Sequence, residues 1–138
     1  MKKFILIMAL LPLVAASLYA QNSTPAKWEE RRNLTIKEWN TDQRTKTRWL
    51  DHQTTYDSEG RKTEEIEYTQ YGQKWRETYE YGDNDKIVKE VLYDEKDRPE
   101  LIRRYEYNAQ NKKIRQYNYA PSGRLLTIKV FEYIIEEQ

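Results

Sequence analysis

Apolar and polar residues alternate with a period of two along most of the chain. Segments such as EEIEYTQ and RRYEYN place aliphatic or aromatic side chains two residues apart, with charged side chains between them. A helix would instead place apolar residues three and four positions apart. The pattern therefore predicts antiparallel strands that form a sheet with one apolar face and one solvated face.

A tyrosine ends each predicted strand, and a residue able to reverse the backbone follows it four positions later. The tyrosines are Tyr56, Tyr68, Tyr81, Tyr93, Tyr107 and Tyr119, and the residues that follow them are Gly60, Gly72, Asp85, Asp97, Asn111 and Gly123. Glycine accepts positive φ freely, and Asn and Asp tolerate it better than other side chains. These six positions predict hairpin turns, with Asp57, Asp94 and Asn108 in the first turn position.

The spacing of the tyrosines reveals an internal repeat. Tyr81, Tyr107 and Tyr133 stand 26 residues apart, and the segments YEYGDND and YEYNAQN share that offset. Two strands and two turns form one unit of such a repeat. Upstream, RRNLTIKEW and TKTRWL predict two more strands joined around TDQR. The predicted fold is all-β: a meander of about eight strands, ending with a strand over Leu125–Ile135, in a single curved sheet or an open half-barrel.

Counting back in steps of two from each strand-ending tyrosine, with these tyrosines on a common side, places the aromatic rings on one face, where they could contact a partner or ligand. These residues are Trp75, Tyr79, Tyr81, Tyr93, Tyr105, Tyr107, Tyr117 and Tyr119. The same count adds a charged row, composed of Glu64, Glu77, Lys89, Arg103, Arg115 and Lys129. A structural interpretation is favoured, because aromatic cross-strand pairs are common in sheets: the sheet curls and the rings form its core, with the charges paired at the rim.

The first twenty residues have the layout of a secretory signal peptide. Two lysines precede an apolar run, and small residues lead up to Ala20, after which we expect cleavage. The apolar region is shorter than the roughly 20 residues that a membrane-spanning helix needs. We therefore expect a signal peptide at 1–20, a flexible lead-in at 21–30 and a β-repeat domain at 31–138, with clear repeats over 54–133. The predicted location is the periplasm or the exterior, with no membrane span after cleavage.

The amino-acid composition argues against several kinds of binding site and catalytic site. The chain has no cysteine, so neither disulfides nor a lipoprotein anchor are expected, and its 24 basic and 23 acidic residues argue against nucleic-acid binding. His52 is the only histidine, which argues against a zinc site. Glutamates such as Glu64 and Glu65 could in principle catalyse glycoside hydrolysis, but neighbouring strand residues point to opposite faces. We predict no cofactor, no metal and no enzymatic activity.

The segments YDSEGRK, YDEKDRP and YAPSGRLL resemble the tyrosine–aspartate (YD) repeats of bacterial cell-surface and toxin-shell proteins. The resemblance covers about residues 54–133. Tyr56, Asp57, Gly60 and Arg61 fit the YD pattern, while Pro99 stands where an apolar residue is usual. The resemblance implies a continuous β-ribbon, although about three units are too few to enclose a cargo.

Three functions fit these observations. The favoured hypothesis is an exported, non-catalytic binding or assembly module of the bacterial envelope, which uses the aromatic face or the free edge strands to contact an envelope protein, a glycan or a second copy. The second is an immunity or inhibitor protein against a secreted toxin, and the third is a carbohydrate-active enzyme.

Overall fold

The computed structural model describes residues 27–136, so the predicted signal peptide and most of the predicted lead-in lie outside the described residues. A short 3-10 helix precedes eight strands. The elements are η1 Glu29–Arg31, β1 Thr35–Thr41, β2 Arg48–Tyr56, β3 Lys62–Thr69, β4 Gly72–Tyr81, β5 Ile87–Tyr93, β6 Pro99–Tyr107, β7 Lys113–Tyr119 and β8 Leu125–Val130.

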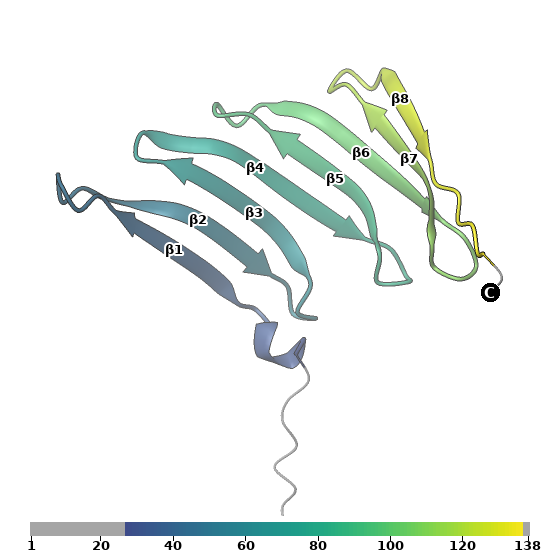
Figure 1. Cartoon of the computed structure of the whole chain (residues 1–138), viewed down its shortest axis with the longest axis horizontal. Helices are drawn as coiled ribbons and strands as arrows, with labels where there is room; N and C mark the ends of the chain where they lie inside the picture. Colours follow the sequence, from purple (N-terminus) through teal and green to yellow (C-terminus); the bar gives the residue numbers. More distant parts are fainter. Residues whose placement is uncertain (1–26, 137–138) are drawn as a thin grey trace, which may run out of the picture.

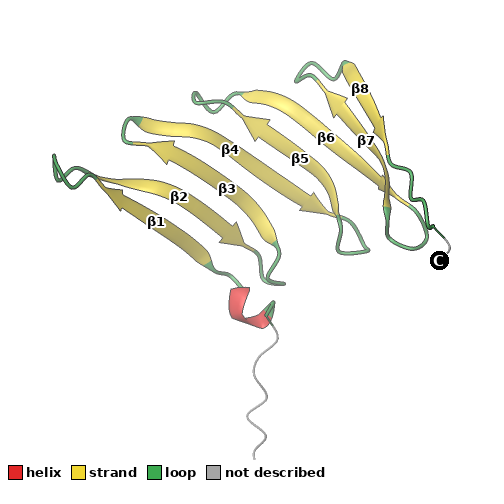
Figure 2. Ribbon diagram, viewed as in Figure 1, coloured by secondary structure: helices red, strands yellow, loops and turns green. Residues whose placement is uncertain are grey.

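The eight strands form one antiparallel sheet in the order in which they occur along the chain, so every connection is a hairpin (Figure 1). The predicted meander is confirmed, and the sheet stays open as a single layer (Figure 2). The hairpins β2–β3, β4–β5 and β6–β7 lie at the end of the sheet next to η1, which we call the η1 end (Figure 1). The other four hairpins lie at what we call the far end. The last strand is shorter than predicted, because β8 stops at Val130 rather than at Ile135.

All six predicted turn residues have positive φ, from 56° at Asp85 to 133° at Gly72. In the hairpin after Tyr56, the Gly60 N–H donates to the Asp57 carbonyl at 3.1 Å, and the Asp57 N–H donates to the Arg61 carbonyl at 2.9 Å. The Asp57 carboxylate also accepts the backbone N–H groups of Glu59 and Arg61. A short acidic side chain therefore closes the turn on itself, as expected for the first turn position.

Two hairpins differ from this pattern. Gly72 is the first residue of β4 and pairs with Thr69, so only two residues join β3 to β4. The β1–β2 loop reverses at Lys46, which has φ 59°. Sequence reasoning missed Lys46 because a lysine carries no signal for positive φ. Here the Asp42 side chain compensates by accepting the N–H groups of Arg44 and Thr45.

The register between adjacent strands shifts once in every hairpin. In β4–β5, Tyr81 pairs with Ile87 but Glu80 pairs with Lys89, so Val88 is an extra residue on the returning strand. The same one-residue β-bulge occurs in all seven strand pairs. A bulge breaks the alternation of side chains between the two faces. In an unbroken strand, residues an even number of positions apart lie on the same face. When a bulge lies between two such residues, they lie on opposite faces.

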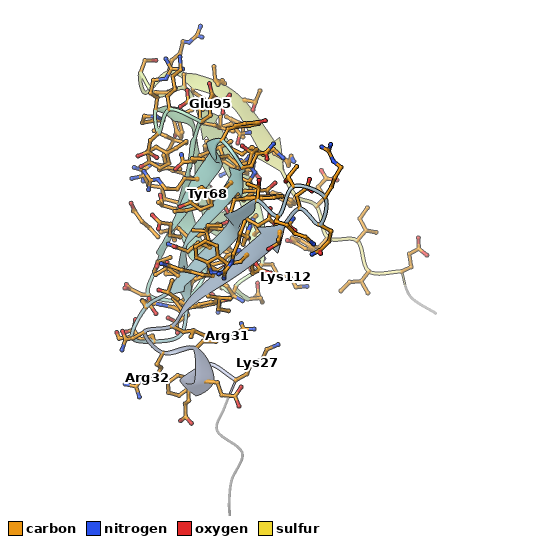
Figure 3. The ribbon with its side chains drawn as sticks, turned by 90° about the vertical axis from the view of Figure 1, so that its left-hand side faces the viewer. Lys27, Arg31, Arg32, Tyr68, Glu95 and Lys112 are labelled. Atoms are coloured by element: carbon orange, nitrogen blue, oxygen red, sulfur yellow. The ribbon has the colours of Figure 1, made fainter. Side chains whose placement is uncertain are left out.

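The sheet has little interior. Among the described residues, only Thr54, Ile66, Tyr79 and Val91 are buried. Seen edge-on, side chains project from both sides of the layer and no other described element covers them (Figure 3). The stability of the folded sheet therefore depends on the backbone hydrogen bonds between strands and on contacts between side chains of neighbouring strands.

Candidate binding faces

The predicted aromatic face does not exist as one surface, because the bulges divide its rings between two faces. Directly paired residues of adjacent strands point to the same side. The face that carries Glu65, Glu77 and Glu90, which we call the carboxylate face, also carries Trp75, Tyr79, Tyr81, Tyr105 and Tyr107. The other face, which we call the reverse face, carries Tyr93, Tyr117 and Tyr119 beside Ile66, Val91 and Ile102.

The prediction of one aromatic face was wrong because it assumed that the side-chain alternation continues unbroken from each strand to the next. Outside β1–β2, where the extra residue is Asp51 within β2, each bulge inserts one residue close to a turn. The tyrosines at the η1 end therefore point to the carboxylate face, and those at the far end point to the reverse face. The predicted charged row is divided for the same reason. Glu77, Arg103 and Lys129 lie on the carboxylate face, whereas Glu64, Lys89 and Arg115 lie on the reverse face.

A continuous chain of polar contacts crosses the carboxylate face. The Tyr79 hydroxyl donates to Glu65 at 2.9 Å and lies 3.0 Å from Glu77, its second carboxylate neighbour. Arg103 donates from one nitrogen, Nη1, to Glu77 at 2.9 Å and to Glu90 at 3.2 Å. The Tyr105 hydroxyl then donates to Glu90 at 2.6 Å. We call this set, from Glu65 to Tyr105, the carboxylate chain.

Side chains from neighbouring strands extend the carboxylate chain at both ends. Lys62 donates to Glu65 at 2.7 Å, and His52 Nε2 lies 3.0 Å from the same carboxylate. At the opposite end, the Lys113 ammonium lies 3.7 Å from the centre of the Tyr105 ring. These contacts link side chains from β2 to β7. Each glutamate of the carboxylate chain has a cation or a hydroxyl as its partner.

These contacts shift the pKa values of the groups in predictable directions. Burial raises the pKa of the Tyr79 hydroxyl, and the carboxylates of Glu77 and Glu65 raise it further. Burial and Glu90 likewise raise the pKa of Tyr105. For the Glu65 carboxyl, burial acts upward, but hydrogen bonds from Lys62 and Tyr79 outweigh it and lower the pKa. At neutral pH Glu65 is therefore an ionised carboxylate, and Tyr79 and Tyr105 are neutral phenols.

Tyrosines at the η1 end hold successive hairpins together. The Tyr81 hydroxyl donates to the Lys62 carbonyl at 2.8 Å, and the Tyr107 hydroxyl donates to the Ile87 carbonyl at 2.6 Å. Tyr133 repeats this contact with the Lys113 carbonyl at 2.7 Å. Each acceptor is the first strand residue after the preceding turn. The 26-residue spacing in the sequence thus corresponds to one repeated hydrogen bond, and the role of these rings is structural.

The reverse face offers a different surface. Arg76 lies over the Tyr93 ring at 3.8 Å and pairs with Glu64 and Asp97. Near the far end, the rings of Tyr117 and Tyr119 stack with centroids 6.4 Å apart. Next to them is a shallow depression of about 340 Å³, lined by Lys89, Ile102, Arg104, Tyr119 and Gly123. This combination of an aromatic platform with basic side chains can stack on a flat group and attract a negative charge.

Sequence reasoning missed some of the most exposed apolar and aromatic side chains. Tyr71, at the tip of the β3–β4 turn, is 90% exposed, and Trp39 in β1 is also exposed. Exposed aliphatic residues line β8 and the segment that follows it: Leu125, Leu126, Ile128, Val130, Ile134 and Ile135. The exposure of β8 could have been predicted from its position as the last strand of the meander, because a terminal strand lacks a neighbour on one side.

The structure also shows how the residues considered for catalysis, metal binding and membrane insertion are arranged. Glu64 and Glu65 lie on opposite faces, as expected, with Glu64 paired to Arg76. Within residues 27–136, no group of three or more acidic, histidine or cysteine side chains is arranged to hold a metal ion. The described part of the chain also contains no helix that is long and apolar enough to cross a membrane.

No protein-family model matches the chain, and no curated protein matches it. The resemblance to YD repeats therefore stays a prediction. Among solved structures, the chain is similar to a mutant of TarM from S. aureus in complex with fondaparinux, α-GlcNAc-glycerol and UDP, with 18% identity, a TM-score of 0.30, and coverage of 70% of this chain and 22% of that one. A second TarM structure has 18% identity, a TM-score of 0.27, and coverage of 67% and 22%. The alignment spans under a quarter of the TarM chain, and likeness at this level carries no argument about function.

Proposed function

We propose that this protein is an exported, non-catalytic β-repeat module that binds or assembles with a component of the bacterial envelope. The observation that supports the proposal is the open single layer: an eight-stranded sheet with four buried side chains and no described element over either face. A sheet with both faces solvated is unusual for a domain that acts alone, because burial of apolar surface is the main stabilising term in folding.

The state of the acidic groups supports a non-catalytic role. A general acid or base must be free to exchange a proton with a substrate. In the carboxylate chain, Glu65, Glu77 and Glu90 are each held by cations or hydroxyls of the protein itself. These contacts stabilise the sheet, which leaves the reverse face as the more suitable surface for a ligand.

On the reverse face, the depression beside Tyr119 is the site where we expect an envelope protein or glycan to bind. The stacked Tyr117 and Tyr119 rings would contact a flat apolar or sugar surface. Arg104 would attract an anionic group, whereas Lys89 already pairs with Glu80 at 3.0 Å. Such a partner would bind without any cofactor.

The test is co-sedimentation of the purified chain, starting at Gln21, with isolated cell-wall sacculi and with envelope membranes. Saturable binding to one fraction that weakens at least tenfold in Tyr119→Ala would support the proposal. The matched control is Tyr71→Ala, which removes an even more exposed ring at the same end of the sheet. The absence of saturable binding to both fractions, or an equal loss in the two variants, would contradict the proposed site.

A further inference from the structure

The two edge strands of the sheet differ in chemistry. In β8, Ile128 is 51% exposed and Val130 is 62% exposed, and both lie on the reverse face. The carboxylate face of β8 carries Thr127 and Lys129. The strand contains no acidic residue, no proline and a single charge. Natural proteins usually protect a free edge with inward-pointing charges, prolines or a covering element.

The free backbone groups of β8 belong to these same apolar residues. The Phe131 N–H donates to the Ile114 carbonyl of β7 at 3.0 Å. In an antiparallel pair, successive residues direct their N–H and C=O groups alternately toward and away from the neighbour. Thr127 and Lys129 therefore bond to β7, whereas Ile128 and Val130 direct their backbone groups away from the sheet.

The other edge is less suited to pairing. The Tyr56 N–H donates to the Leu34 carbonyl at 2.8 Å, so the alternation directs the backbone groups of Thr35 and Lys37 away from the sheet. Lys37 places a charge in the middle of β1, on the same face as Trp39, and Glu38 follows on the other face. Pairing β8 with β1 of another copy would set Lys37 against Ile128 or Val130.

We propose that two copies of this chain pair through their β8 strands, antiparallel and with Ile128 directly opposite Ile128 of the second copy. This inference rests on the proposed assembly function and adds a second copy of the chain to the partners it would have. A two-fold axis perpendicular to the sheet keeps each face continuous, so the exposed aliphatic side chains of both copies meet on the reverse face. Thr127 then lies opposite Lys129 of the second copy, so no two like charges face each other. The product is one continuous sixteen-stranded sheet.

The first test is the mass of the purified chain in solution, measured by sedimentation equilibrium over a hundredfold range of concentration. We expect a mass of two chains that does not rise further, because a two-fold interface is closed. Ile128→Lys should give a monomer with an unchanged far-ultraviolet circular dichroism spectrum, since the side chain is exposed. The matched control, Ile36→Lys, makes the same change at the β1 edge, where the side chain is 41% exposed, and should leave the dimer intact.

The second test fixes the register and uses the absence of cysteine from the natural chain. Residues directly opposite in an antiparallel pair have Cα atoms about 5.5 Å apart or less, within the range that a disulfide needs. Ile128→Cys should therefore form a covalent dimer under mild oxidation. Val130→Cys is the control, because in this register the two Val130 positions lie about 13 Å apart.

Several results would overturn the inference. These are a monomeric wild-type chain, a dimer lost in Ile36→Lys and kept in Ile128→Lys, open-ended growth with concentration, or equal cross-linking at positions 128 and 130. If Ile128→Lys loses its fold, the cysteine pair decides. Failure of the dimer is distinguishable from failure of the proposed function. The wild-type chain can bind or fail to bind the envelope fractions whether it is a dimer or a monomer.

Discussion

The two ends of the sheet share one sequence pattern, yet their tyrosines occupy different environments. At the η1 end, Tyr81 and Tyr107 lie on the carboxylate face and their hydroxyls bond to carbonyls of the preceding hairpin. At the far end, Tyr93 and Tyr119 lie on the reverse face, where one ring is covered by Arg76 and the other stacks on Tyr117. The difference comes from the bulge in each hairpin, which moves the next tyrosine to the other side.

This comparison indicates where the stability of a sheet without a substantial core resides. At the η1 end and across the carboxylate face, hydrogen bonds run from one strand to the next and beyond. The reverse face has fewer such links but carries two of the four buried residues, Ile66 and Val91. We therefore expect substitutions at the η1 end and on the carboxylate face to be more destabilising than matched substitutions elsewhere.

The largest expected effect is at the turn glycines, which differ between the ends. A Cβ added to Gly60 at the η1 end would lie 2.2 Å from the Trp28 carbonyl oxygen, whereas one added to Gly123 at the far end meets nothing within 4 Å. Both have positive φ, so either change to alanine costs about 1–2 kcal/mol in backbone strain. Gly60→Ala should cost a further ~1–3 kcal/mol, because the backbone at Trp28 must move.

Urea unfolding of both glycine variants measures this difference. Equal losses of stability in Gly60→Ala and Gly123→Ala would mean that the segment around Trp28 does not pack on the first turn of the η1 end, and this difference between the two ends would disappear.

The next largest effect on the free energy of unfolding distinguishes the carboxylate face from the reverse face. It compares two adjacent arginines of β6. Arg103 links Glu77 to Glu90 on the carboxylate face, where its side chain is 29% exposed. Arg103→Ala leaves two partly buried carboxylates without their cation and should lower the free energy of unfolding by about 2–3 kcal/mol. Arg104→Ala, on the exposed reverse side of the same strand, should change it by less than about 0.5 kcal/mol.

Thermal and urea denaturation of the two arginine variants provide the measurement. A loss in Arg104→Ala as large as that in Arg103→Ala would show that the carboxylate chain contributes no more than an ordinary surface ion pair.

Much of the fold was predictable, because hairpin turns have strong local signals. Gly60, Asp97 and Asn111 adopt the backbone conformation expected from their residue types, and the eight strands lie between the turns as predicted. The Lys46 turn was not predictable, since its positive φ is stabilised by Asp42 and not by the residue that adopts it. The end of β8 is likewise set by tertiary contacts, because Tyr133 bonds to the Lys113 carbonyl where continued strand pairing was expected.

The candidate faces were harder to predict. A bulge adds one residue without a sequence signal of its own, so Val88 reads as an ordinary strand residue. Once that residue is inserted, Tyr81 and Tyr93 lie on opposite faces even though an even number of positions separates them. The carboxylate chain was invisible for the same reason: Glu65, Tyr79 and Arg103 come together only when the register of three strand pairs is known.

A smaller effect isolates the hydroxyl groups at the η1 end. Tyr107→Phe keeps the ring and removes the hydrogen bond to the Ile87 carbonyl, which should cost about 1 kcal/mol. Tyr119→Phe is the matched change at the far end, where the hydroxyl makes no hydrogen bond within residues 27–136, and should be nearly neutral. Chemical denaturation of the two variants side by side tests the comparison, and a neutral Tyr107→Phe would remove the proposed role of the repeated contact.

The smallest effect is the contribution of Glu65 to the pH dependence of stability. The folded protein lowers the pKa of this carboxyl below its ordinary value of 4.5, because hydrogen bonds from Lys62 and Tyr79 outweigh burial. The folded state thus binds fewer protons than the unfolded state, and the stabilisation is present above about pH 4.5 and lost as the pH falls through the folded pKa.

After allowance for solvent screening, we expect the Glu65 carboxylate to contribute about 0.5–1 kcal/mol to the free energy of unfolding. In urea unfolding, Glu65→Gln should be less stable than the wild type at pH 7, and the gap should narrow as the pH is lowered from about 5 to about 3. Arg104→Ala, which removes no carboxylate, should differ from the wild type by the same amount at both pH values. A gap for Glu65→Gln that is as large at pH 3 as at pH 7 would mean that the glutamate acts through packing, and the ionic character assigned to the carboxylate face would then rest on Arg103 alone.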